Sequence, residues 1–231
     1  MPHETQNESL FARVRITLGI RNRIVGGVPT DPELIKGWIA ANMPKVEQAE
    51  REKLAQKTTE ELGAAAEAQA EGMWTTFKRD AGAIYIESRA VKACFKEAAN
   101  ILRDMLTKRE GRADGKKSRY TNLKSRLAER LFIEEEKIPL MRGGVRVKDP
   151  DGNQERVLHV MTAQGPRSAL KRFDYVSAPA TITFTARYLR DGVVDPELLR
   201  TLLDFASWNG LGADRAQGDG LFEVVELQPL D

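Results

Sequence analysis

The sequence contains only one cysteine, Cys94, and two histidines. A single thiol cannot form an internal disulfide or a cysteine-based zinc cluster, and we expect Cys94 to be a small buried side chain in a helical pattern. A run of about 18 apolar residues is also missing, and the N-terminus has no apolar signal segment. We therefore expect a cytoplasmic protein that has no membrane partner and requires no metal and no cofactor.

A large net charge is also missing, because 36 Lys and Arg residues face 34 Asp and Glu residues, for a formal net charge of +2. The distribution is more informative than the sum. Cations concentrate at 108–130, and acidic residues concentrate at 47–71. A local basic block can attract a polyanion even when the chain is nearly neutral. We expect a basic arm at about 108–130 whose phosphate-binding residues are Lys116, Lys117, Arg119, Lys124 and Arg126.

Regular apolar patterns predict both strands and helices. Residues 13–20 and 181–189 alternate between apolar and polar side chains, which is typical of half-buried strands. A short strand at 83–87 leads into Ser88, which can begin a helix with one apolar stripe. Asp195 and Pro196 mark the start of another helix, which ends at Asn209 and Gly210 and precedes a last strand at 221–227.

Turn and capping signals predict the remaining elements. Asp31 and Pro32 can begin a helix, and we interpret about 30–72 as a helical insertion. Residues 122–136 are predicted to be helical, with Glu134, Glu135 and Glu136 on a solvated side. Residues 138–163 are predicted to form a hairpin around the turn-forming residues 149–153. The three tryptophans, Trp38, Trp74 and Trp208, are interpreted as packing residues.

The order of the predicted elements indicates the fold class. Apart from the insertion, the chain runs strand, helix, antiparallel strands, strand, helix, strand, which is the ferredoxin-like β-α-β-β-α-β order. We therefore predict one α+β domain with a ferredoxin-like (RRM-like) antiparallel sheet and two covering helices. The helical insertion and the basic arm would extend from this domain. Many unrelated proteins share this fold, so it assigns no function.

A glycine-rich loop follows the last predicted helix and reads GLGADRAQGDG over residues 210–220. Glycines can expose main-chain N–H groups without a Cβ atom in the way, which creates an anion site, and Arg215 adds a bidentate donor. The alternative interpretation is a simple helix-to-strand connection with a surface arginine. A dinucleotide-binding loop is not favoured, because that motif follows a strand and begins a helix.

Three segments, in this order, resemble the RAMP superfamily of CRISPR effector proteins, and in particular the backbone subunits that coat guide RNA. The first strand leads into Ile24-Val25-Gly26-Gly27, which is similar to their opening strand and IGG turn. The second segment, 77–99, resembles their G-x-x-Y-I-P-G-S-S-L-K-G-x-L-R motif, with matches at Gly82, Tyr85, Ile86, Ser88, Lys92 and Phe95. The third segment, the terminal loop, is similar to their C-terminal G-x-G-x-x-R-x-x-G-x-G.

Three departures from the family pattern stand out. The insertion that follows Gly27 is unusual for the family. Glu87-Ser88-Arg89 replaces the small P-G-S-S step of the second motif. The catalytic aspartate of target-cutting relatives has no clear counterpart, since Asp31 is the one nearby candidate and Pro32 favours a capping role for it. A diverged relative encoded by a phage or a mobile element would fit these departures equally well.

The resemblance implies a non-catalytic protein that holds single-stranded guide RNA by its phosphates. It also implies partners, namely other copies of the chain and other subunits of a ribonucleoprotein complex. Sequence-tolerant, salt-dependent binding is expected, with Arg13, Arg15 and Arg187 on the open sheet face completing a basic track. Besides the arm residues, the candidate RNA-binding residues are Gly210, Gly212, Arg215, Gly218, Gly220, Arg21, Arg23, Gly26, Gly27, Arg89 and Lys92.

Two alternatives of other classes stay open. The first is an endoribonuclease of the same superfamily that processes CRISPR RNA, for which His159 is the candidate general base. The second is a phage or mobile-element protein-assembly module that acts through the helical insertion. Cleavage of RNA would indicate the nuclease, and failure to retain RNA at low salt would indicate the assembly module. Salt-sensitive retention without cleavage would indicate the non-catalytic RNA-binding protein.

Overall fold

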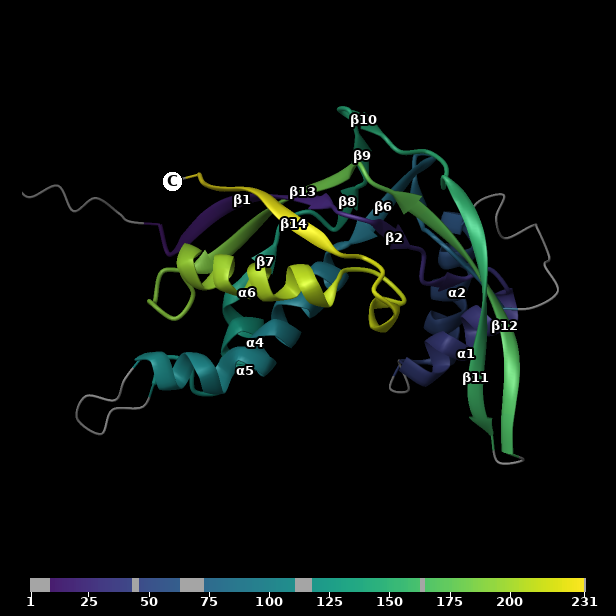
Figure 1. The fold of residues 1–231 in the computed structure, drawn as a ribbon, viewed down its shortest axis with the longest axis horizontal. Helices are drawn as coiled ribbons and strands as arrows, with labels where there is room; N and C mark the ends of the chain where they lie inside the picture. Colours follow the sequence, from purple (N-terminus) through teal and green to yellow (C-terminus); the bar gives the residue numbers. More distant parts are fainter. Residues whose placement is uncertain (1–8, 43–45, 63–72, 111–117, 163–164, 231) are drawn as a thin grey trace, which may run out of the picture.

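The computed structural model describes residues 9–42, 46–62, 73–110, 118–162 and 165–230 (Figure 1). Their fold is α+β, as the sequence predicts, with five α-helices among the described residues. The helices are α1 (Pro32–Asn42), α2 (Gln48–Leu62), α4 (Ser88–Glu110), α5 (Leu123–Arg130) and α6 (Pro196–Asn209), with a short 3₁₀ helix η1 (Arg215–Gln217). The strands are β1 (Phe11–Ile20), β2 (Arg23–Val25), β3 (Val28–Pro29), β4 (Met73–Thr76), β5 (Arg79–Asp80), β6 (Ala83–Glu87), β7 (Leu131–Ile133), β8 (Lys137–Pro139), β9 (Met141–Arg142), β10 (Val145–Arg146), β11 (Gly152–Thr162), β12 (Gly165–Ser177), β13 (Ala180–Leu189) and β14 (Phe222–Pro229).

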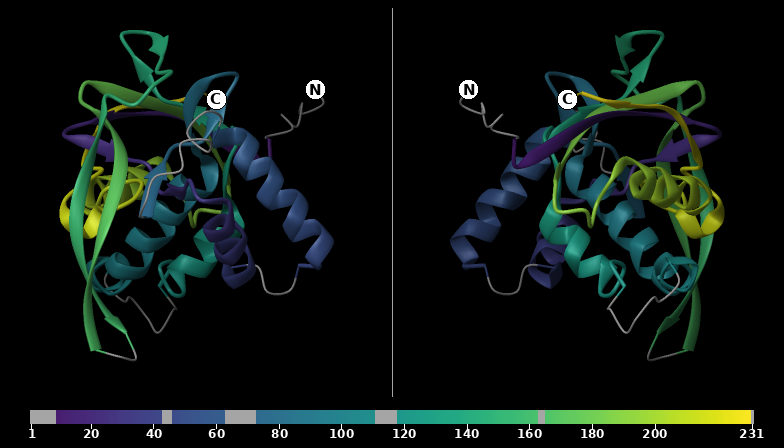
Figure 2. Two further views of the ribbon diagram at one scale, coloured as in Figure 1. Left: turned by 90° about the vertical axis from the view of Figure 1, so that its right-hand side faces the viewer. Right: turned by 90° about the vertical axis from the view of Figure 1, so that its left-hand side faces the viewer.

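The main sheet has β1 at its centre. β1 pairs antiparallel with β13 on one side and with β14 on the other, and β13 also pairs antiparallel with β7 and β9. The strand order across the sheet is therefore β14, β1, β13, then β7 and β9. Helices α4, α5 and α6 lie below one face of this sheet, and its other face is open (Figures 1 and 2).

The alternation in β1 explains which face is covered. Val14 and Ile16 are fully buried and Leu18 nearly so, while Arg13 and Arg15 on the opposite face are exposed. The buried side chains join the apolar stripes of α4 and α6 in one core, which includes Phe95, Leu202 and many neighbours. Burial of each such side chain contributes roughly 1.5–3 kcal/mol, and this face therefore fixes the register of β1.

The ladder of the main sheet continues into a second sheet. β1 leads into β2 and β12 leads into β13, and β2 pairs with β12 as β1 pairs with β13. The second sheet is mixed, since β12 pairs antiparallel with β11 but parallel with β4. The β11–β12 hairpin runs far past the main sheet to a distant tip (Figure 1).

Helices α1 and α2 belong to the predicted insertion and have a small core of their own. Ile35 and Ile39 of α1 pack with Ala55 of α2, and Val28 and Leu54 pack against them. Asp31 caps α1, because its Oδ1 accepts a hydrogen bond from the Glu33 N–H at 2.8 Å. This is the capping role that the sequence predicts.

Other local predictions are confirmed. α4 begins at Ser88, and Asp195 caps α6 by accepting a hydrogen bond from Leu198 N at 2.7 Å. Cys94 is buried, as predicted. Burial raises the pKa of its thiol to about 12. None of the described helices is long and apolar enough to cross a bilayer.

Two predictions of secondary structure are wrong. The helix predicted over 122–136 ends at Arg130, because Leu131–Ile133 pairs with β13 instead, and Glu134–Glu136 follow a strand. The hairpin predicted around 149–153 does not form, since β10 pairs with β9 and β11 pairs with β12. Residues 149–151 form a corner before β11 instead, where Asp151 accepts two hydrogen bonds from Arg142 at 2.8 and 2.6 Å.

Candidate nucleic-acid interface

One cavity of about 450 Å³ brings together the three motifs that the sequence singled out. We call it the loop groove. The IVGG turn, the start of α4 and the first half of the glycine-rich loop all contribute to its wall, and α2 closes one side through Thr58. Its lining consists of Val25, Gly27, Val28, Pro29, Thr58, Thr76, Phe77, Lys78, Tyr85, Ile86, Glu87, Arg89, Ala90, Ala93, Gly212 and Ala213.

Gly210 and Gly220 close the base of the glycine-rich loop. Both residues have positive φ and are buried, and Leu211 N donates to Gly220 O at 2.8 Å. A Cβ atom on Gly220 would lie 1.9 Å from Leu211 O, and one on Gly210 would lie 2.6 Å from Asp219 O. Because these two glycines serve the packing of the loop on itself, their predicted exposure to RNA is wrong.

Gly26 and Gly212 let chain segments approach one another. A Cβ atom on Gly26 would lie 2.3 Å from the Thr76 backbone, and one on Gly212 would lie 3.0 Å from Ile24 Cγ1. Ala213 N also donates to Val25 O at 3.3 Å. Gly26 is buried, whereas Gly27 and Gly212 line the loop groove and Gly212 is exposed. At Gly27 and Gly212 the groove wall therefore consists of main chain without a side chain.

The rim of the loop groove is polar where α4 begins. Arg89 is about half exposed and its Nη2 lies 2.6 Å from Glu87 Oε2. The first turn of α4 has no acidic residue, but Glu87 directly precedes it, so the charges of Arg89 and Glu87 offset each other at this rim.

A nearly buried charge cluster attaches α2 to the same rim. Lys78 Nζ lies 3.1 Å from Glu61 Oε2 and 3.4 Å from Glu87 Oε1. The Tyr85 hydroxyl donates to Glu61 Oε2 at 3.1 Å. Burial, together with the nearby Glu61 carboxylate, raises the pKa of Tyr85 well above its usual range, so the phenol is protonated at neutral pH.

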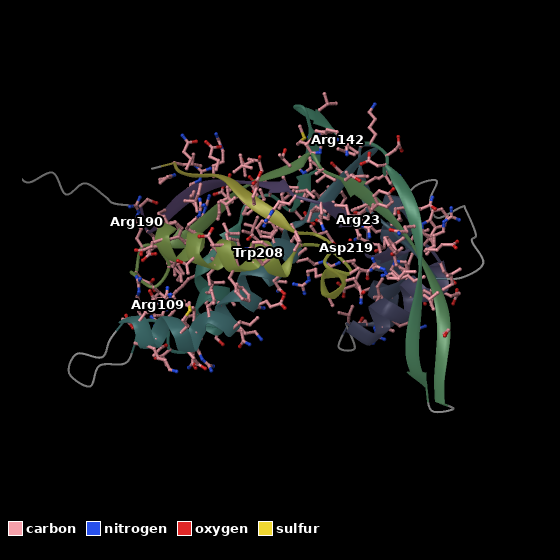
Figure 3. The ribbon with its side chains drawn as sticks, in the orientation of Figure 1. Arg23, Arg109, Arg142, Arg190, Trp208 and Asp219 are labelled. Carbon is pink, nitrogen blue, oxygen red and sulfur yellow. The ribbon has the colours of Figure 1, made fainter. Side chains whose placement is uncertain are left out.

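The acidic residues of the loop bind cations of the second sheet. Asp219 accepts from Arg23 Nε at 2.7 Å and from Arg156 Nη2 at 3.2 Å, and Asp214 lies 2.7 Å from Lys171 Nζ. Figure 3 shows Arg23 and Asp219 next to each other. Three cations thus surround two carboxylates. Arg23 anchors the loop, which gives it a structural role besides the predicted RNA contact.

Three other predicted arginines bind within the molecule. Arg215 Nη1 lies 2.5 Å from Glu97 Oε2, and this hydrogen bond lowers the pKa of the Glu97 carboxyl. Arg119 pairs with Asp195 at 2.6 Å, and Arg126 donates to Arg119 O at 2.7 Å. These contacts fasten the loop to α4 and the basic segment to α6.

Two of the four predicted lysines, Lys92 and Lys124, lie within the described residues. Lys92 Nζ lies 5.1 Å from the centre of the Phe132 ring, on a side of α4 that does not line the loop groove. Partial burial lowers its pKa, and Lys96 lowers it further. Lys124 is exposed on α5. Lys116 and Lys117 lie outside the described residues, as does the side chain of His159.

The open sheet face is less basic than its sequence indicates. Glu134 accepts hydrogen bonds from Arg13 Nη2 at 3.0 Å and from Arg187 Nε at 2.7 Å. Both arginines lower the pKa of this carboxyl, Arg13 most strongly, so Glu134 neutralises part of the predicted basic track. Arg15 stays exposed on the same face.

Arg21 and Trp208 form an exposed pair beside the loop. The Arg21 guanidinium carbon lies 4.4 Å from the centre of a Trp208 ring, and Trp208 is 70% exposed. The interpretation of Trp208 as a packing residue is therefore wrong. A sequence signal existed, because Trp208 continues the polar stripe of Arg200 and Asp204 on the outer side of α6.

No family model matches the chain, and no curated protein matches it in sequence. Solved structures do match, and two of them contain Cmr proteins. One is a chain in "Cryo-EM structure of the Type III-B Cmr-beta bound to cognate target RNA", with 14% identity and a TM-score of 0.47. The other is Cmr6 from Pyrococcus furiosus, with 9% identity and a TM-score of 0.44.

Both matches span nearly all of this chain. The match to the Cmr-beta chain covers 95% of this chain and 60% of that chain. For Cmr6 the shares are 93% and 98%. At this identity and TM-score the likeness assigns no role to any residue, so residue roles follow from the geometry above.

Proposed function

We propose that the chain binds single-stranded RNA in the loop groove, as a RAMP-type subunit of a ribonucleoprotein complex. The observation that carries this proposal is the convergence of the three motifs on one cavity. The groove combines apolar walls, side-chain-free main chain at Gly27 and Gly212, and the half-exposed guanidinium of Arg89 at its rim. Apolar walls suit unpaired bases and riboses, and the rim suits phosphates.

The arrangement of the core supports the family part of the proposal. The order β14, β1, β13 and β7, with α4 and α6 against one face, supports a ferredoxin-like core. Glu87-Ser88-Arg89 takes the place of the small P-G-S-S step, and the half-exposed Arg89 guanidinium can donate hydrogen bonds to a phosphate there. The subunit would hold the strand without cleaving it, assemble side by side with further copies, and use the predicted insertion or basic segment to reach a neighbour.

RNA binding can be tested with the full chain and fluorescently labelled 30-nucleotide RNA and DNA. We expect retention of RNA at low salt and a linear fall of the logarithm of the affinity with the logarithm of the salt concentration. The RNA should stay intact both with millimolar magnesium and with chelator. Failure to retain RNA at low salt, or cleavage of it, would overturn the proposal.

The place of binding can be tested with a matched pair of arginines on α4. Arg89 is at the groove and pairs with Glu87, whereas Arg103 is three to four turns away and pairs with Asp104 at 2.8 Å. Arg89→Ala should weaken RNA binding roughly 5-fold and reduce the salt slope by about 0.7, the value for one phosphate contact of a single strand. Arg103→Ala should change neither quantity, and equal effects would contradict the assignment.

A further inference from the structure

Trp208 lies in the last turn of α6, on the side that faces away from the core. The inner side of this helix buries Leu199, Leu202 and Ala206, whereas its outer side carries an exposed ion pair between Arg200 and Asp204. The outer position leaves 70% of Trp208 exposed. An indole is among the side chains that gain most from burial, so a ligand that covered this ring would be stabilised by the contact.

The Arg21 guanidinium already lies over the ring, 4.4 Å from its centre. Among the described residues, no carboxylate pairs with this guanidinium, whereas Arg23, two positions further on, pairs with Asp219. The pair therefore has an open aromatic surface and a positive charge that no described acidic group neutralises. A cation–π contact of this kind leaves the guanidinium N–H groups at its edge able to donate.

The backbone around Arg21 is fixed against the loop. Arg21 N donates to Leu221 O at 2.9 Å, and Asn22 Nδ2 donates to Gly218 O at 2.6 Å. Leu221 N in turn donates to Asn22 Oδ1 at 3.1 Å. The pair is thus held beside Gly218, in the exposed second half of the loop, while Gly212 and Ala213 of the first half line the loop groove. A strand that follows the loop out of the groove would reach it.

We propose that Trp208 and Arg21 form a stacking platform for one nucleotide of single-stranded RNA. The base would stack on the indole, and the adjacent phosphate would accept hydrogen bonds from the guanidinium. This inference rests on the proposed function and extends it to a second contact. Tryptophan and arginine are also common central contacts in protein–protein interfaces. Here the unneutralised charge of Arg21 and the exposed main chain of the loop favour RNA as the occupant.

The platform can be tested with the full chain, a uridine oligonucleotide and an abasic oligonucleotide of the same length. Trp208→Ala should weaken binding of the uridine strand about 10-fold with an unchanged salt slope, and Trp208→Phe should restore most of the affinity. Binding of the abasic strand should be the same for all three proteins, since it has no bases to stack. Arg21→Ala should reduce the salt slope by about 0.7.

The outcomes separate the platform from the proposed function. If Trp208→Ala leaves uridine binding unchanged while Arg89→Ala still weakens it, the platform is wrong and the groove assignment holds. Equal loss on the abasic strand would also overturn stacking. Loss of self-association by Trp208→Ala in sedimentation, with RNA affinity unchanged, would identify a protein contact instead. If the wild-type chain binds no RNA, both proposals fail.

Discussion

The glycines of the terminal loop differ in what a Cβ atom would meet. Gly218 and Gly220 both have positive φ, +83° and +78°. Open space surrounds a Cβ atom on Gly218, whereas one on Gly220 would lie 1.9 Å from Leu211 O. The sequence indicates why glycines occur here, but not which of them serve packing, because that depends on the path of the surrounding backbone.

These two glycines provide a matched stability prediction. Gly218→Ala should lower the free energy of unfolding by about 1 kcal/mol, the strain of an alanine in the left-handed region. Gly220→Ala adds an overlap with a carbonyl oxygen and should lower it by at least about 3 kcal/mol. Urea denaturation at neutral pH measures both values, and similar losses for the two variants would contradict this explanation of the loop.

Among the elements, α2 depends on a few polar contacts for its position on the core. Its apolar side chains Leu54 and Ala55 pack with α1 and β3, whereas Glu61 holds the helix to Lys78 and Tyr85. Lys78 and Glu61 are only 13% and 12% exposed. Loss of Glu61 leaves Lys78 with Glu87 as its carboxylate partner, 3.4 Å away, and leaves the Tyr85 hydroxyl without its acceptor.

Glu61→Ala should therefore loosen α2 with little effect on the main core. We expect amide hydrogen exchange of residues 48–62 to speed up on the order of 100-fold, which corresponds to the loss of about 3 kcal/mol. Glu60→Ala is the control, since Glu60 is exposed and its carboxylate accepts a hydrogen bond from Gln56 of the same helix. Equal exchange in the two variants would show that Glu61 does not hold the helix.

The corner between β10 and β11 makes stability depend on pH. Asp151 accepts hydrogen bonds from Arg142, which lower its pKa most strongly, and from Ser177 N at 2.7 Å. Because the pKa of this carboxyl is below its ordinary value of 3.8 in the folded state, its contribution is complete above that value. The contribution is lost as the pH falls through the folded-state pKa.

Asp151→Asn should thus destabilise the protein by about 1 to 2 kcal/mol at pH 7. The difference from wild type should shrink as the pH falls below 3.8, because the wild-type carboxyl then becomes neutral as well. Asp149→Asn, at an 84% exposed position, is the control and should have little effect at either pH. Urea denaturation across this pH range checks the trend, and a constant difference would contradict it.

The strands and helices that the sequence predicts well are those with local signals. The alternation of 13–20 and 181–189 and the cap at Asp195 each depend on neighbouring residues alone. Residues 131–133 continue a helical pattern but become a strand, because pairing with β13 outweighs local propensity. Residues 149–153 have the composition of a hairpin turn. They form the corner before β11 and its first two residues instead, because β11 pairs with β12.

The chain as a single body brings its functional candidates together from distant segments. The loop groove joins Val25–Pro29, the start of α4 and Gly212–Ala213, and no local pattern reveals that these segments meet. The sequence motifs nevertheless named residues in all three. The sequence could not predict which arginines form ion pairs within the molecule, because Arg23, Arg119 and Arg215 pair with carboxylates that are distant in sequence.

Photo-crosslinking of 4-thiouridine RNA, followed by identification of the modified peptides, tests RNA binding in the loop groove most directly. Three regions should carry the crosslinks, namely Val25–Pro29, Tyr85–Ala93 and the loop from Gly210 to Gly220 with the adjoining Trp208. Excess unlabelled RNA should abolish them. Crosslinks confined to the open sheet face around Arg15, with none in these three regions, would contradict the assignment of the loop groove.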